Sequence, residues 1–483
     1  MFHISRSACC LLQFAASVLA LLLPCAVGLG VAEDWPWFLG PRHDGTSNEQ
    51  GLNLDWKNSP VPVLWKKRVG TGYSAPSIVG QQLIFHDLVG RDERVSRLQA
   101  SDGKAVWEKT YPCDYKDLYG YNNGPRCSPL IVEDRCFTLG PNGKLSCLNR
   151  ADGAIVWQKN LQDEFDLPDW FFGVGCTPIF HDNMLIVLVG GQPNSGVVAF
   201  DATSGSVLWQ HVGRETWHGA ETSVAKRKYR WTGDEMVASY SSPIVATIHG
   251  QQHLLCLMRQ GLVSLNPRTG EEYFHYWFRA KVHESVNAAR PVVIGNQVFL
   301  SAAYRLGATL LDVQPDGRGV SPAWKNDTLQ AHWSTPIHVD GFLYGFSGRY
   351  RNEGELRCVR VSDGKLMWKT TGFEGDSRSL VRQPGSQQLL DKATMEPVPH
   401  PYFGRGSLTR IGEHFLVLGE YGTLALSKID SSGYQELHRI SFPEINYPAW
   451  TAPVVSNGRL YLRSEDWLLC LDFSSQTNSS GKP

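Results

Sequence analysis

Residues 127–157, CSPLIVEDRCFTLGPNGKLSCLNRADGAIVW, contain the pattern that decides the fold. The stretch begins with two small residues and Pro129, continues with short apolar segments between turn residues, and ends with Asp152-Gly153 and Trp157. Short apolar segments bounded by Gly, Asn and Asp are typical of β-strands, and Asp-Gly provides the positive φ that a tight hairpin needs. The stretch therefore predicts four short antiparallel strands joined by turns.

The same opening pattern occurs eight times along the chain. Seven copies end in Pro, and one keeps the pattern with Leu in its place. The openings are Ser74-Ala75-Pro76, Cys127-Ser128-Pro129, Cys176-Thr177-Pro178, Ser241-Ser242-Pro243, Ala289-Arg290-Pro291, Ser334-Thr335-Pro336, Gly406-Ser407-Leu408 and Thr451-Ala452-Pro453. Where nothing is inserted, the period is about 45 to 53 residues, which suits a four-stranded propeller blade.

The repeats also end alike, with a Gly turn followed by a strand that carries Trp. Clear copies pair Gly103 with Trp107, Gly153 with Trp157, Gly205 with Trp209 and Gly364 with Trp368; weaker copies pair Gly270 with Trp277 and Gly317 with Trp324, and Ser431-Ser432-Gly433 has no Trp. A large flat side chain at a fixed place in each repeat favours packing between neighbouring blades. We interpret six tryptophans of this kind as structural: Trp65, Trp107, Trp157, Trp209, Trp324 and Trp368.

The two ends of the repeat region complement each other. The eighth copy stops near Phe473 without its last strand, whereas residues 61–67, with Trp65, resemble a closing strand that precedes the first repeat. A ring closed in this way leaves no large unpaired sheet edge. The sequence therefore predicts an all-β fold, an eight-bladed β-propeller of four-stranded antiparallel blades whose last blade is closed by an N-terminal strand. A β-sandwich does not need eight copies, and a β-helix needs shorter coils.

The closing pattern, Asp-x-x-(Ser/Thr/Asp)-Gly-(Lys)-x-x-Trp, resembles the repeat signature of pyrroloquinoline-quinone (PQQ) propellers. Residues 34–45, DWPWFLGPRHDG, are similar to the segment that precedes many exported bacterial propellers of this group. The family includes quinoprotein dehydrogenases and the non-catalytic outer-membrane assembly lipoprotein BamB. The resemblance covers roughly residues 34–473; it implies the fold strongly and the function weakly, because the same blades serve enzymes and scaffolds.

The N-terminus predicts export. A single cation, Arg6, precedes the apolar residues 11–23, and small residues follow at 30–32, as in a cleaved signal peptide; an uncleaved anchor is the alternative. We expect a signal peptide at 1–32, a lead-in segment at 33–60, the propeller at 61–473 and a disordered polar tail at 474–483. The mature protein is expected outside the cytoplasm, periplasmic or extracellular, with no transmembrane anchor after cleavage.

Charge and cysteine content narrow the possible partners. The chain has 46 Lys and Arg against 47 Asp and Glu, so it lacks the basic field that nucleic-acid binding requires. Eight cysteines lie beyond the signal, from Cys113 to Cys470, and an even number permits disulfides in an oxidising compartment. Cys127 could pair with Cys176 or with Cys113, but several of these cysteines occupy repeat columns that hold small residues, which packing alone explains.

One column of the repeat predicts the mouth of the central channel. Three residues before each Pro, or before Leu408, stand Tyr73, Arg126, Gly175, Tyr240, Ala288, Trp333, Arg405 and Trp450, with Asn287 and His332 one residue earlier. We expect Tyr73, Arg126, Tyr240, Asn287, His332, Trp333, Arg405 and Trp450 to bind a protein, a peptide or a small anionic or aromatic ligand. The alternative is that the aromatic side chains fill the channel and the arginines pair locally with carboxylates. Insertions at 213–237 and 375–401 enlarge the same face.

The sequence favours a binding or scaffold module over an enzyme. Quinoprotein dehydrogenases of the resembled family hold PQQ with Ca²⁺ and often have adjacent cysteines, whereas the predicted mouth column contains no Asp or Glu and the mature chain no adjacent Cys pair. A hard cation needs carboxylate ligands, so we expect no catalytic residue, metal or cofactor. A PQQ- and Ca²⁺-dependent alcohol or sugar dehydrogenase is one alternative, and a periplasmic glycan-binding or sensor module is another.

Overall fold

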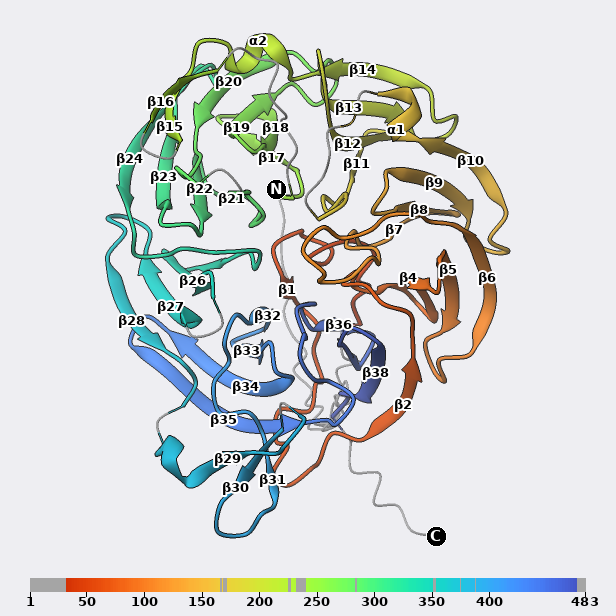
Figure 1. Ribbon diagram of the computed structural model, residues 1–483, viewed down its shortest axis with the longest axis vertical. Helices are drawn as coiled ribbons and strands as arrows, with labels where there is room; N and C mark the ends of the chain where they lie inside the picture. Colours follow the sequence, from red (N-terminus) through yellow and green to blue (C-terminus); the bar gives the residue numbers. More distant parts are fainter. Residues whose placement is uncertain are drawn as a thin grey trace, which may run out of the picture.

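The computed structural model describes residues 32–475 except 166, 168–171, 225–226, 232–239, 283–284, 351–352, 374 and 387. Eight four-stranded antiparallel units surround a common centre (Figure 1). Blade 1 contains β3 (Ser77–Val79), β4 (Gln82–Val89), β5 (Asp92–Gln99) and β6 (Ala105–Pro112). Blade 2 contains β7 (Leu130–Val132), β8 (Arg135–Leu139), β9 (Lys144–Asn149) and β10 (Ile155–Asn160). Blade 3 contains β11 (Ile179–His181), β12 (Met184–Gly191), β13 (Ser195–Asp201) and β14 (Val207–His211).

The next three blades repeat this order. Blade 4 contains β17 (Ile244–Ile248), β18 (Gln251–Leu257), β19 (Gly261–Leu265) and β20 (Glu272–Trp277). Blade 5 contains β21 (Val292–Ile294), β22 (Gln297–Ala302), β23 (Gly307–Val313) and β24 (Val320–Asn326). Blade 6 contains β25 (Ile337–Val339), β26 (Phe342–Ser347), β27 (Glu355–Arg360) and β28 (Leu366–Thr370). Within each blade the strands pair in chain order.

The last two blades include strands from the N-terminal segment. Blade 7 contains β32 (Ser407–Ile411), β33 (His414–Leu418), β34 (Thr423–Asp430) and β35 (Gly433–Ser441), with the two-residue β1 (Thr46–Ser47) added parallel to β32. Blade 8 contains β36 (Val454–Ser456), β37 (Arg459–Arg463), β38 (Trp467–Asp472) and β2 (Val63–Arg68). Strand β2 pairs antiparallel with β38, and Trp65 stands opposite Cys470. This confirms the predicted eight blades and the closure by an N-terminal strand.

The apolar core lies between the blades, because each sheet buries both faces against its neighbours. One buried cluster joins blades 2 and 3 and another joins blades 3 and 4. Six tryptophans of the outer strands extend this packing and donate their indole N–H to a carbonyl of the next blade at 2.7 to 3.2 Å: Trp65, Trp107, Trp157, Trp209, Trp324 and Trp368. A buried indole needs such an acceptor, so each contact also fixes how one blade sits on the next.

Two joints between blades depart from the repeat. In blade 4 the register places Phe274, not Trp277, at the tryptophan position, opposite Ser264. Trp277 instead packs against Trp217 and Trp231 of the first insertion, so the sequence pairing of Gly270 with Trp277 is wrong. At the joint of blades 7 and 8, Trp56 of the lead-in segment lies between two side chains, His438 and Phe473, and fills the space where blade 7 has no Trp.

The lead-in segment runs across the face of the ring opposite the starts of the inner strands, which we call the far face. Trp35 pairs with Ile78 of blade 1, and the carbonyl of Pro36 accepts a bond from the Ile131 N–H of blade 2 at 2.9 Å. The buried Arg290 guanidinium of blade 5 donates to the His43 carbonyl at 3.1 Å. With β1 against blade 7, the segment therefore touches blades on several sides of the channel.

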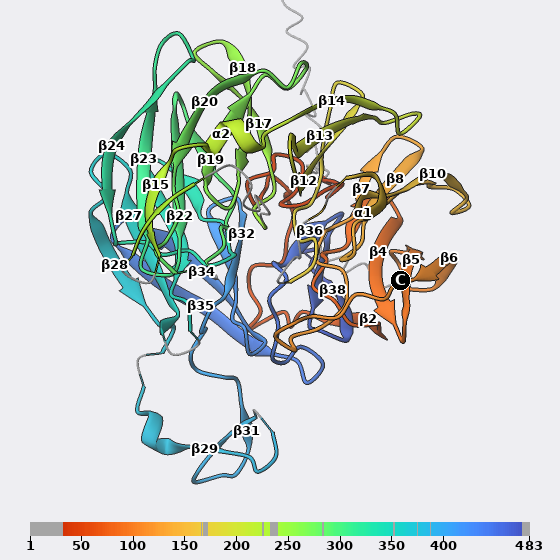
Figure 2. The ribbon, with the colours of Figure 1, turned by 45° about the horizontal axis from the view of Figure 1, so that its top comes forward.

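The two insertions form small elements of their own. The first contains α2 (Arg214–Trp217), β15 (Glu221–Val224) and β16 (Arg227–Arg230), and its Lys226 and residues 232–237 lie outside the described residues. The second contains a 3-10 turn (Ser377–Ser379) and β29 (Leu380–Arg382), β30 (Leu389–Asp391) and β31 (Pro397–Val398), and it stands away from the disc in Figure 2. One further short helix, α1 (Leu161–Glu164), follows blade 2. In the described part of the chain, no helix has the length and apolarity needed to cross a bilayer.

The described cysteines form no disulfide, and the first two residues of the predicted tail pair with the lead-in segment. All eight described cysteines are buried free thiols, and the Cys127 thiol donates to the Cys176 carbonyl at 3.2 Å, so neither considered disulfide is present. Ser474 pairs with Leu52, and the Ser475 N–H donates to Gly51 at 2.7 Å. The sequence places these two residues in a disordered tail, but the lead-in segment holds them in place. The signal region 1–31 and residues 476–483 lie outside the described residues.

Candidate ligand-binding mouth of the central channel

Hydroxyl side chains of the repeated openings bring the inner strands together around the channel. The Ser128 hydroxyl accepts a bond from the Ala75 N–H at 3.2 Å, and the Thr177 hydroxyl accepts one from the Ser128 N–H at 3.1 Å. The Ser242 hydroxyl continues this pattern by accepting from the Thr177 N–H at 2.9 Å. The middle residue of the opening pattern therefore links blades 1 to 4, and the residues just before it point into a shared space.

That space is a cavity of about 530 Å³ at the start of the inner strands. All eight positions of the predicted column line it: Tyr73, Arg126, Gly175, Tyr240, Ala288, Trp333, Arg405 and Trp450. His332 also lines it. Asn287 does not contribute to the lining; its buried amide donates to the carbonyls of Met258 and Phe278 at 2.9 and 3.0 Å. The expectation that Asn287 faces the mouth is therefore wrong. Its amide instead bonds to backbone carbonyls of blade 4 and of the residue that follows it.

The lead-in segment provides apolar surface deeper in the cavity. Trp35, Phe38 and Leu39 line it together with column residues from all blades. Trp35 is buried to 2 % exposure and paired with Ile78, so its position is fixed by blade 1. The channel is consequently closed toward the far face by the chain's own N-terminal segment.

Aromatic side chains form most of the wall. Ring centroids are 4.9 Å apart for Tyr73 and Trp450, 5.1 Å for Trp450 and Trp333, 5.1 Å for Trp333 and His332, and 5.5 Å for His332 and Tyr304. Burial raises the pKa of Tyr73, and it raises that of Tyr304 to about 12. These phenols are therefore neutral at ordinary pH, and the wall is apolar with hydroxyl groups at its edges.

The aromatic lining continues through residues of the inter-blade loops. Tyr121 lies 5.7 Å from Trp450 and 6.0 Å from Phe172, and Phe172 lies 5.5 Å from Tyr240. Tyr119, 5.2 Å from Phe172, remains half exposed, as does Tyr121. The rim is thus an exposed aromatic surface that is continuous with the cavity.

Each of the two predicted arginines has a carboxylate partner. Arg126 Nη2 lies 2.6 Å from Asp117 Oδ2, and its guanidinium also donates to the Gly124 and Asn122 carbonyls, both at 3.0 Å. The Asp117 carboxylate is almost fully buried. The charge of Arg126 is therefore largely balanced within its own loop.

Arg405 is balanced in the same way on the other side. Its Nε and Nη2 donate to Glu420 Oε2 at 3.1 and 2.9 Å, and Glu420 is completely buried. Trp450 donates its indole N–H to the same oxygen at 3.2 Å. The guanidinium also lies 4.8 Å from the ring of Trp333. For both arginines the structure thus supports the alternative of local pairing, and an anionic ligand would compete with a bound carboxylate.

His332 is a neutral member of the wall. Burial, and secondarily the nearby Arg405 and Arg349, lower its pKa to about 3. Its Nε2 lies 3.3 Å from the Tyr304 hydroxyl. Its Nδ1 and the Trp333 Nε1 are buried atoms without a hydrogen-bond partner in the described part of the chain. Because both atoms are buried, a ligand in the cavity would reach them only if the wall moved.

Sequence reasoning missed the residues that line the mouth from hairpin loops. Tyr304 lies in the β22–β23 loop, and Arg349 and Tyr350 lie in the β26–β27 loop. The second strand of a blade runs back toward the mouth, so its hairpin loop ends beside the column. The aromatic-basic pairs Tyr304-Arg305 and Arg349-Tyr350 recur at that place of the repeat, and this signal would have found them.

Among the described residues, the mouth does not offer the free carboxylates that a calcium-bound quinone would need. Three described carboxylates contact its lining. Glu353 accepts hydrogen bonds from the backbone N–H groups of Arg349 and Tyr350, and Asp117 and Glu420 accept from Arg126 and Arg405 and from backbone N–H groups. Ca²⁺ is held by several oxygen ligands that include carboxylates. Over the described residues, no group of three or more potential metal-binding side chains was found. If Asp117 or Glu420 bound a metal ion instead, Arg126 or Arg405 would lose its ion pair in a mostly buried site.

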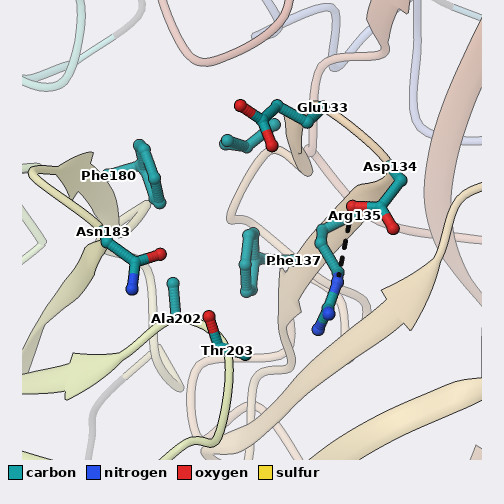
Figure 3. Close-up of a pocket in the computed structure, with 9 residues that line it drawn as sticks. Glu133, Asp134, Arg135, Phe137, Phe180, Asn183, Ala202 and Thr203 are labelled. Atoms are coloured by element: carbon teal, nitrogen blue, oxygen red, sulfur yellow. Dashed lines mark ion pairs between the residues drawn. The ribbon is translucent and has the colours of Figure 1, made fainter.

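A second, smaller cavity of about 330 Å³ lies between blades 2 and 3 on the far face. Phe137 and Phe180 face each other there with centroids 6.5 Å apart, and Asp134 pairs with Arg135 at 3.5 Å (Figure 3). Glu133 at its edge is exposed. None of the predicted site residues lines this crevice. It is the gap that remains where two neighbouring blades diverge.

Comparisons with known proteins agree with this architecture. The profile of the family described as outer membrane protein assembly factor BamB matches residues 91–370. BamB of Yersinia pestis is 23 % identical over 151 residues, which are 31 % of this chain and 36 % of that protein. The matched region thus spans about a third of the length of this curated relative.

Solved structures show the same fold at low identity. BamB from Moraxella catarrhalis superimposes with a TM-score of 0.52 at 14 % identity, over 86 % of this chain and 98 % of that chain. Quinohemoprotein alcohol dehydrogenase from Comamonas testosteroni gives 0.54 at 13 % identity, over 91 % and 80 %. These likenesses concern the propeller alone. Because the family profile covers more than half of the chain, the chain belongs to the family of PQQ-repeat β-propellers described as outer membrane protein assembly factor BamB.

Proposed function

We propose that the protein is an exported scaffold that binds polypeptide segments with apolar or aromatic side chains at the mouth of its central channel. The observation that carries this proposal is the cavity of about 530 Å³ whose wall joins aromatic residues of successive blades to an exposed aromatic rim. Large exposed apolar patches on soluble proteins mark binding surfaces. The relatives named BamB, an outer membrane protein assembly factor, support the scaffold role.

The chemistry of the wall favours such a ligand over a highly charged one. Arg126 and Arg405 are already paired with Asp117 and Glu420, so little net charge is left on that part of the surface. Aromatic rings contribute large contact areas at low cost in side-chain entropy. The hydroxyl-bonded inner strands hold these rings in place before a ligand arrives, and a pre-formed site binds more tightly.

The place of action follows from the predicted signal peptide at 1–32 and from the family. An outer membrane assembly factor works outside the cytoplasm, and the apolar residues 11–23 of this chain have the length of a signal segment. We therefore place the mature protein in the periplasm of a bacterial cell.

The test is a binding measurement on the rim, where substitutions do not disturb the core. The double variant Tyr119→Ala/Tyr121→Ala should bind an array of immobilised peptides rich in Phe, Tyr and Trp at least about tenfold more weakly than the unchanged protein, because aromatic anchors dominate such contacts. The matched control is Tyr402→Ala, a tyrosine of 37 % exposure at the root of the second insertion. Equal binding by all three proteins, or no binding by any, would overturn the proposal.

A further inference from the structure

Among the described residues that line the mouth, one guanidinium forms no ion pair with a carboxylate. Of the three arginines that line the cavity, Arg126 and Arg405 form ion pairs with Asp117 and Glu420. No carboxylate of the described chain lies within 4.0 Å of the guanidinium of the third, Arg349. Glu353 of the same hairpin loop accepts hydrogen bonds from the backbone N–H groups of Arg349 and Tyr350, which leaves the guanidinium of Arg349 without an ion pair in the described part of the chain, on the side formed by blades 5 and 6.

Arg349 is nevertheless held in place. Its guanidinium carbon lies 4.4 Å from the ring centroid of Tyr304 and 5.1 Å from that of Tyr350. Its backbone N–H donates to Glu353 Oε2 at 3.1 Å, and its carbonyl accepts a bond from Arg405 at 3.1 Å. A guanidinium stacked on rings keeps its N–H edge available, and that edge matches the two oxygens of a carboxylate.

Two buried polar atoms lie in the same cluster. His332 contacts Tyr304, and Trp333 contacts His332, with centroid distances of 5.5 and 5.1 Å. The Nδ1 of His332 and the Nε1 of Trp333 have no partner among the described residues. Both residues line the cavity, so they offer ring surface to a ligand, whereas these two buried nitrogens are covered by neighbouring protein atoms.

We propose that the blade 5–6 side of the mouth, formed by Tyr304, His332, Trp333 and Arg349, binds the C-terminal carboxylate of a polypeptide whose last side chain is aromatic or large and apolar. This inference rests on the proposed function and specifies its ligand. The ligand carboxylate would form the ion pair that Arg349 lacks among the described residues, and the last side chain would contact the aromatic wall. The residues that precede it lie against the half-exposed Tyr119, Tyr121 and Tyr350, which a small aromatic acid would leave uncovered.

The experiment compares two probes on the full mature protein by isothermal titration calorimetry. One is the peptide Gly-Gly-Gly-Leu-Trp with a free carboxylate, and the other is the same peptide with a C-terminal amide. The free acid should bind at least about tenfold more tightly, because charge-assisted hydrogen bonds are stronger than neutral ones, and this preference should decrease with added salt. In Arg349→Gln the two peptides should bind alike, at the affinity of the amide.

Arg305→Gln is the matched control, because Arg305 is an exposed arginine beside Tyr304 that does not line the cavity. It should keep the full preference for the acid. Equal binding of acid and amide to the unchanged protein, or a preference that survives Arg349→Gln, would overturn this inference and leave the proposed function standing. Failure of both peptides to bind would overturn both. If indole-3-propionate alone binds as tightly as the peptide acid, the assignment to a polypeptide end is wrong.

Discussion

At the scale of single residues, the joints between blades depend on a tryptophan that lies flat on the glycine turn of the next blade. Trp107 donates to the Arg150 carbonyl at 3.0 Å, and Gly153 in the same turn has a φ of +73°. A Cβ at Gly153 would lie 2.6 Å from Trp107 Cε3. Glycine is therefore needed there for two reasons, the positive φ and the contact with the ring.

Gly153→Ala should separate these two reasons when it is compared with Gly250→Ala. Gly250 has a φ of +77°, and a Cβ added there would meet nothing within 4 Å, so its substitution has only the backbone cost of about 1 kcal/mol. Gly153→Ala should lose about 2 kcal/mol more, because the ring of Trp107 must move. Chemical unfolding followed by Trp fluorescence measures both. Equal losses would show that the ring contact contributes nothing.

At the scale of elements, the lead-in segment acts as a brace across the far face. It pairs with blades 1 and 7, and its Glu49 lies buried against blade 8, where it accepts a bond from the Gly458 N–H. Glu49 Oε2 is buried without a partner in the described chain. Burial raises the pKa of Glu49 from 4.5 to about 7, so the folded chain holds a proton there more tightly than the unfolded chain.

The raised pKa of Glu49 predicts that stability decreases with rising pH. Its contribution is fully present below about pH 4.5 and is lost as the pH passes through about 7, where the buried carboxylate must ionise. The loss amounts to about 3 kcal/mol in the free energy of unfolding. Glu49→Gln should therefore remove most of the difference in Tm between pH 5 and pH 8. The control Glu413→Gln, an exposed glutamate in the β32–β33 turn, should keep that difference; a Glu49→Gln variant that also keeps it would refute the argument.

At the scale of the whole molecule, the ring is closed by hydrogen bonds between segments from opposite ends of the chain. Strand β2 completes blade 8 next to β38, and Trp65 of β2 then reaches the Ala100 carbonyl of blade 1 at 2.9 Å. One strand thus both completes a blade and makes the joint to the next. Without it, β38 would present an unpaired edge, which is a site of aggregation.

Two truncations of the chain should therefore behave differently. A chain that begins at residue 61 lacks the brace but keeps β2, and it should remain a folded monomer with a lower Tm and an open channel floor. A chain that begins at residue 69 also lacks β2, and it should aggregate, because blade 8 has only three strands and the joint to blade 1 loses Trp65. Size-exclusion chromatography with light scattering distinguishes the two outcomes. A monomeric second truncation would show that closure by β2 is dispensable.

The sequence by itself determined the blades, their number, the closing strand and the column that lines the mouth, because each follows from a short pattern repeated at a fixed register. Tyr73, Trp333 and Trp450 were found in this way. Tertiary structure alone decided what lies beside the column, since those contacts join residues far apart in the chain: Glu420 with Arg405, Trp56 between blades 7 and 8, and the lead-in segment beneath the cavity. Tertiary structure also decided that Arg126 and Arg405, but not Arg349, form ion pairs among the described residues. A repeat pattern predicts the backbone position of a side chain, but it does not predict which charged residue of another loop lies next to it.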